Sequence, residues 1–176
     1  CAADASAQVC ECGCSGDKHT AIETTQEERE LVDLLRPHFK LNSTDRIQNQ
    51  SINDTVAMKL SRADFTYGEV HDITFLQFLN RTFEEHGEGA AGGNFYDLGC
   101  GVGKPMFVAA LSNWRFERCV GVELLPGVLA LGESLKGFID PAITAYYSAV
   151  GRSDVADVQF WERDIKQTVL PEQTRL

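Results

Sequence analysis

The 176-residue sequence predicts an α/β fold built on a parallel sheet. Three short apolar segments, at residues 95–98, 119–124 and 158–161, have the length and composition of buried strands. Segments with helical spacing of apolar residues separate them, and a glycine-rich turn directly follows the first strand. Strands that alternate with helices in this way are typical of a parallel sheet with crossover helices.

Composition places the chain among globular proteins. Hydrophobic residues make up 43% and charged residues 24%, which suits a single domain with its own core. The apolar runs are too short to cross a membrane. The net charge of −10 carries no electrostatic signature of a nucleic-acid binder. Such acidity either attracts a basic partner, for instance a histone tail or a polyamine, or simply keeps the protein soluble.

Residues 1–22 are expected to form a flexible tail rich in cysteine. Possible metal ligands in it are Cys1, Cys10, Cys12, Cys14 and His19. Thiolates and imidazole bind zinc, but structural zinc sites normally pair cysteines two to four residues apart, and no second cluster follows. We therefore predict no metal site.

Residues 23–93 are interpreted as a helical lead-in. Threonines at positions 24–25 are suitable caps for a first helix, which Pro37 is expected to end or kink. A short second helix is predicted at 53–60, and a third begins after Asp72, a favourable capping residue.

The turn after the first predicted strand carries the clearest chemical signal. It runs Asp97-Leu98-Gly99-Cys100-Gly101-Val102-Gly103. Glycines there allow a sharp turn and the close approach of a ligand, which in open α/β sheets binds at this carboxyl edge. A dinucleotide fingerprint would need a glycine where Lys104 stands. Asp97 would repel a pyrophosphate but suits the cationic amino group of S-adenosylmethionine (AdoMet), so the turn favours AdoMet over a nicotinamide cofactor.

Acidic residues end the next two predicted strands. Glu123 lies 20 residues beyond Gly103 and can accept hydrogen bonds from both ribose hydroxyls of a nucleotide. Folds that bind dinucleotides and folds that bind AdoMet both use an acid there, so this position alone does not separate them. Asp164 can accept from the adenine amino group, with Ile165 packing on the ring; the alternative is a solvated residue at a strand end.

Residues 94–176 are assigned to the N-terminal half of an AdoMet-binding α/β domain. A helix is expected after the glycine turn, Pro126 is expected to open another, and Pro141 is expected to restart the helix after a break. Cys100 and Cys119 lie among apolar residues and are expected to be buried free thiols.

Together these motifs resemble the DOT-one family of histone lysine methyltransferases over roughly residues 60–165. That family combines a Y-G-E loop, a D-L-G-S-G-V-G turn and a G-V-E strand end, which correspond here to residues 67–69, 97–103 and 121–123. The resemblance implies that the loop closes over the methionine end of AdoMet. The cofactor-binding residues that it implies are Tyr67, Gly68, Glu69, Asp97, Gly99, Gly101, Gly103, Lys104, Glu123, Asp164 and Ile165.

The resemblance also implies a Rossmann-like class I methyltransferase sheet, which has seven strands in that family. Only 73 residues follow Gly103, room for about two more strand–helix units at roughly 30 residues each. We therefore expect a C-terminally incomplete domain that binds cofactor weakly and does not turn over by itself. No catalytic residue is predicted, because the Asn-containing segment that the family uses follows the fourth strand.

The function implied is AdoMet-dependent methyl transfer to a lysine of a nucleosomal histone, with the nucleus as location and the cytoplasm otherwise. Such transfer needs an aligned, neutral amine. Two alternatives stay open: a class I methyltransferase acting on another protein or a small molecule, and a non-catalytic binding module with an AdoMet-type fold. Substitution of Asp97 or Glu123 by alanine is expected to abolish cofactor binding without unfolding the protein.

Overall fold

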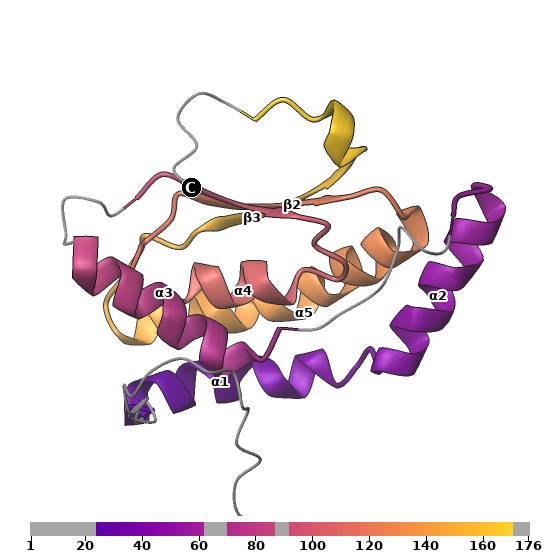
Figure 1. The fold of residues 1–176 in the computed structure, drawn as a ribbon. Coiled ribbons are helices and arrows are strands. Elements are labelled where there is room, and N and C mark those ends of the chain that lie inside the picture. The colour runs from indigo at the N-terminus through magenta and orange to yellow at the C-terminus, as the bar shows by residue number, and fades with distance from the viewer. Residues whose placement is uncertain (1–23, 62–69, 87–91, 171–176) are drawn as a thin grey trace, which may run out of the picture.

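The structure is a computed structural model that describes residues 24–61, 70–86 and 92–170 (Figure 1). Three helices come first: α1 (Gln26–Phe39), α2 (Thr44–Ala57) and α3 (Asp72–His86). Strands and helices then alternate: β1 (Asn94–Leu98), α4 (Lys104–Ala110), β2 (Arg118–Glu123), α5 (Pro126–Ala149), β3 (Asp157–Glu162) and the short 3-10 helix η3 (Ile165–Gln167). The predicted tail at 1–22 lies outside the described residues.

The three strands form one parallel sheet in the order β1-β2-β3. Both crossover helices, α4 and α5, lie on the same face of this sheet, and α1 and α3 lie beneath them (Figure 1). Parallel pairing places the ends of β1 and β2 side by side, with Asp97 opposite Gly121 and Leu98 opposite Val122. The expectation of a mixed α/β fold with a parallel sheet is therefore confirmed.

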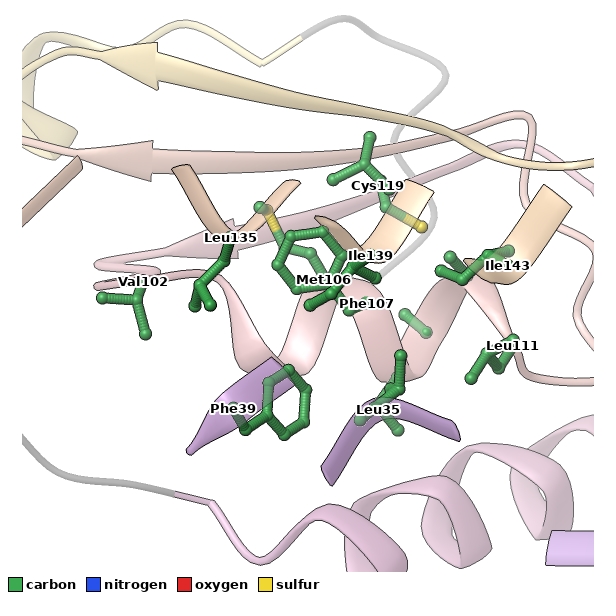
Figure 2. Close-up of a cluster of buried hydrophobic side chains, with 14 of the residues drawn as sticks. Leu35, Phe39, Val102, Met106, Phe107, Leu111, Cys119, Leu135, Ile139 and Ile143 are labelled. Atoms are coloured by element: carbon green, nitrogen blue, oxygen red, sulfur yellow. The ribbon is translucent and has the colours of Figure 1, made fainter. Parts of the chain in front are cut away.

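The core lies between the sheet and the helices, with α4 at its centre (Figure 2). Met106 and Phe107 of this helix have no exposed surface. The Phe107 ring lies 6.4 Å from that of Phe39 in α1 and 6.3 Å from that of Phe160 in β3. One buried aromatic side chain thus joins the first helix to the last strand, and the helical lead-in shares the core of the sheet.

Several local predictions are confirmed by the helix ends. Thr25 caps α1, because its hydroxyl accepts from the Glu28 N–H while the Glu28 carboxylate accepts from the Thr25 N–H. Asp72 is the first residue of α3, and its carboxylate accepts from the Ile73 N–H. The thiols of Cys100 and Cys119 are buried and free, as expected.

The second helix differs from its prediction. It begins at Thr44, well before residue 53, and ends at Ala57. Ser43 supplies the start, since its hydroxyl accepts from the Arg46 N–H. Ile47, which has no exposed surface, holds this polar stretch against the rest of the protein. Burial of a few side chains therefore stabilises a helix in a stretch whose local sequence is rich in turn-forming residues.

One proline differs from expectation. Helix α5 continues without a break through Pro141, whereas α1 runs only two residues beyond Pro37, to Phe39. A proline inside a helix removes one backbone hydrogen bond. In α5 the buried side chains Ile139 and Ile143 lie on either side of Pro141 in the sequence and share one core-facing stripe. Burial of these apolar side chains outweighs the loss of one backbone hydrogen bond at Pro141.

Two features of the described residues bear on other classes of protein. None of the helices described is long and apolar enough to cross a membrane. Within the same residues, no group of three or more His, Cys, Asp or Glu side chains is arranged to hold a metal ion.

Candidate functional site

The turn between β1 and α4 is built from glycines in left-handed conformations. The φ angles are +83° at Gly99, +56° at Gly101 and +82° at Gly103, a region that other residues rarely adopt. The N–H groups of Gly99 and Cys100 both donate to the Val122 carbonyl, at 2.8 and 3.1 Å. The turn is therefore tied to the end of the neighbouring strand.

Gly103 is required for space as well as for its backbone angle. A Cβ atom at this position would lie 2.7 Å from Met106 Cε and 2.7 Å from Phe160 Cζ. Its absence lets the start of α4 approach β3 closely. The glycine therefore sets how far the first turn of the helix stands from the strand ends.

Glu123 ends β2 and is held rigidly. Its carboxylate is buried, with 8% of the residue exposed. Oε2 accepts from the Gly101 N–H at 3.0 Å, and Oε1 accepts from the N–H groups of Leu124 and Leu125 at 2.8 and 3.0 Å. One carboxylate thereby links the glycine turn after β1 to the turn after β2.

Asp97 lies next to this carboxylate, near the end of β1. Burial, and to a lesser extent the negative charge of Glu123, together raise the pKa of Asp97 to about 6. Its Oδ2 atom is buried and accepts no hydrogen bond within the described part of the chain. Two carboxylates that share a site and leave a buried oxygen unsatisfied favour binding of a cation or of a hydrogen-bond donor.

The Cys100 thiol lies within reach of the charges of both acids. Burial raises the pKa of its thiol well above the usual range, and the charges of Asp97 and Glu123 raise it further. The side chain therefore stays a neutral thiol and serves as an apolar filler, with no role as a nucleophile.

The end of β3 meets the same turn. Ile165 is 41% exposed, and its Cδ1 atom would lie 3.7 Å from a Cβ placed on Gly99. Asp164 is used locally: its Oδ1 accepts from the Lys166 N–H at 2.9 Å and its Oδ2 from the Gln167 amide at 3.1 Å. The structure thus brings Ile165 to the glycine turn, while the Asp164 carboxylate caps η3.

The remaining predicted site residues have other positions. The Lys104 ammonium lies over the ring of Phe39, 5.6 Å from its centroid. Tyr67, Gly68 and Glu69 fall outside the described residues. The residues that the structure brings together at the carboxyl edge of the sheet are Asp97, Gly99, Gly101, Gly103, Glu123 and Ile165.

One residue near the site was missed by the sequence analysis. Asp54 of α2 is buried, and its carboxylate accepts from the N–H groups of Gly127 and Val128 at the start of α5. The sequence contains an indirect signal, because Leu125 and Pro126 open that helix without a local capping side chain. The free N–H groups at the start of α5 therefore need an acceptor from another part of the chain, but the sequence does not indicate which residue supplies it.

Comparison with known families bears on the same segment. The family model described as histone methylation protein DOT1 matches residues 50–176, from the second half of α2 through the glycine turn and the strand-end acids. No curated protein matches the chain.

Proposed function

The chain belongs to the DOT1 family of histone methylation proteins, and on that premise we propose that it binds AdoMet at the carboxyl edge of its sheet for methyl transfer to a histone lysine. Members of this family are histone methyltransferases that generally use AdoMet. The observation that carries the proposal for this chain is the pair of adjacent carboxylates, Asp97 and Glu123, on either side of a preformed glycine turn.

The donor set suits the chemical groups of AdoMet. The unsatisfied Oδ2 of Asp97 is a partner for the ammonium of its amino-acid portion, and a positive charge there would offset the repulsion from Glu123. Glu123 is fixed by three backbone donors, which leaves about one of the roughly four acceptor sites of its carboxylate for a ribose hydroxyl. Ile165 offers an apolar surface for the adenine ring.

AdoMet, when bound, supplies a methyl group activated by a positively charged sulfur. The residues of this chain hold and orient the donor, which is the larger part of such catalysis because the methyl group must be in line with the attacking nitrogen. The target lysine has to arrive without its extra proton. We assign the residues described here to cofactor binding and none of them to that proton transfer.

Calorimetric titration of the chain with AdoMet tests the binding step. The wild type is expected to bind, and Asp97→Asn is expected to bind at least about tenfold more weakly, the size of one hydrogen bond to a charged group. Asp157→Asn, an exposed acid at the start of β3, is the matched control and should bind like the wild type. Absence of binding by the wild type would favour a non-catalytic module.

A methylation assay tests the substrate class. A longer protein that contains this chain is incubated with labelled AdoMet and nucleosomes, free histones or small amines, because the chain by itself is not expected to turn over. Transfer to a histone lysine is the expected result. Transfer to small amines alone would contradict the proposal and indicate a different class I methyltransferase.

The choice of variant at Glu123 matters. Glu123→Ala would leave three buried or partly buried backbone N–H groups without an acceptor, so it is expected to destabilise the fold as well as the cofactor site. Glu123→Gln keeps one oxygen, which can still accept from the N–H groups of Leu124 and Leu125, and loses the acceptor for the Gly101 N–H together with the charge. It is therefore the milder variant, and its stability is measured beside its affinity for AdoMet.

A further inference from the structure

Helix α5 begins without a capping side chain of its own. Leu125 occupies the N-cap position and offers no side-chain acceptor, and Pro126 follows with no N–H to donate. The next two N–H groups, of Gly127 and Val128, donate to Oδ2 of Asp54 at 2.8 and 3.0 Å. A residue of α2, more than 70 positions earlier in the chain, thus caps the helix that follows β2.

Asp54 is itself buried and oriented. Only 8% of the residue is exposed, and its Oδ1 accepts from the Gln50 amide at 2.8 Å. Gly127 makes this approach possible, because a Cβ atom at that position would overlap the Gln50 amide and the Asp54 carboxylate. The contact is therefore a close fit between α2 and the start of α5, which lie side by side in Figure 1.

The same turn is held from its other side by Glu123. The N–H groups of Leu124 and Leu125 donate to Glu123, and those of Gly127 and Val128 donate to Asp54. The residue between these two pairs is a proline. Every backbone N–H of residues 124–128 is thus directed to one of two carboxylates, and Asp54 anchors the segment against which the Glu123 carboxylate is held.

We propose that Asp54 is a positioning residue for cofactor binding, which fixes the β2–α5 turn so that Glu123 faces the ribose hydroxyls of AdoMet. The proposal rests on the proposed function. Without Asp54, two N–H groups at the helix start lose their acceptor and the turn loosens. Glu123 would then become ordered only when the ligand binds. The free-energy cost of that ordering reduces what the ribose hydroxyls contribute to the affinity for AdoMet.

The test compares AdoMet with an analogue that lacks both ribose hydroxyls, by calorimetry on the full chain. The wild type is expected to prefer AdoMet about tenfold or more. Asp54→Ala should lose most of this preference, with the analogue bound as well as by the wild type. Asp54→Asn keeps an oxygen acceptor for both N–H groups and should restore the preference. Asn53→Ala, an exposed neighbour on α2, is the matched control and should behave like the wild type.

Loss of the preference in Asp54→Ala, with rescue by Asp54→Asn, supports the proposal, since a general loss of stability would weaken both ligands alike. An unchanged preference in folded Asp54→Ala would overturn it. If that variant does not fold, as judged by circular dichroism, Gln50→Ala takes its place: a reduced preference supports the proposal and an unchanged one overturns it. Absence of AdoMet binding by the wild type would instead overturn the proposed function.

Discussion

At the scale of single residues, the buried Asp97 carboxyl group stabilises the folded chain less when it is ionised than when it is protonated. Its pKa is about 6 in the folded chain against an ordinary value of 3.8, because burial and Glu123 disfavour its ionised form. Between about pH 3.8 and pH 6, the folded chain therefore binds a proton at Asp97 that the unfolded chain does not bind. The contribution to stability is complete below about pH 3.8 and is lost as the pH rises through about 6, at most about 3 kcal/mol.

This residue predicts a trade between stability and binding. Asp97→Asn should raise the melting temperature of the unliganded chain at pH 7.5, because the amide cannot ionise, and the gain should shrink toward pH 4. The same variant should bind AdoMet more weakly. Thermal melts of wild type and variant across pH 4–8 provide the measurement. A stability difference that does not change with pH would show that ionisation of Asp97 is not the cause.

The raised pKa also sets the direction of the pH dependence of binding. Protonation of Asp97 removes the charge that suits a cationic ligand, so AdoMet affinity is expected to fall as the pH drops through about 6. Calorimetry at pH 5 and pH 7.5 checks this direction. An affinity that rises at the lower pH would exclude Asp97 as the partner of a cation.

At the scale of elements, helix α1 lies before the segment matched by the family model, yet it is part of the core. Leu35 has no exposed surface, and Figure 2 shows it with Phe39 on the side of α1 that faces α4. The helix therefore supports the underside of α4, whose first turn follows the glycine turn of the site. Its packing holds α4 in place.

Truncation of one core side chain measures this support. Leu35→Ala is expected to lower the free energy of unfolding by about 2–5 kcal/mol, because it opens a cavity between α1 and α4. Leu41→Ala, at a position that is 51% exposed, is the control and should change it by less than about 1 kcal/mol. Urea unfolding followed by circular dichroism gives both values. Equal effects of the two substitutions would mean that α1 does not pack as described.

At the scale of the whole molecule, helices α1, α3, α4 and α5 lie on one side of the sheet (Figure 1), and the chain carries a net charge of −10. An acidic protein is repelled by the phosphates of DNA and attracted to basic protein surfaces. For a histone-directed protein, this favours recognition through the basic histone surface over recognition through the DNA.

The charge predicts a binding preference. The chain should not retard a DNA duplex in a gel at about 150 mM salt, and any binding to free histones should weaken as salt is raised. Binding to histones that is insensitive to salt, or tight binding to DNA alone, would contradict this expectation.

The sequence by itself determined the order of strands and helices after residue 94, the glycine turn and the acid at the end of β2, because each depends on neighbours in the chain. Alternating apolar segments select strands and helices locally, and left-handed turns select glycine. The same local motifs were enough to indicate the family, which the family match confirms. The roles of the individual residues in cofactor binding stay predictions.

Only the tertiary structure decided how far helices run and which distant groups meet. The buried stripe of α5 carries the helix through Pro141, and burial of Ile47 helps to form α2 where the sequence is rich in turn formers. The raised pKa of Asp97 and the capping of α5 by Asp54 depend on groups that are distant in the sequence. Burial and hydrogen bonding between such groups depend on where the whole chain folds, which no short stretch of sequence specifies.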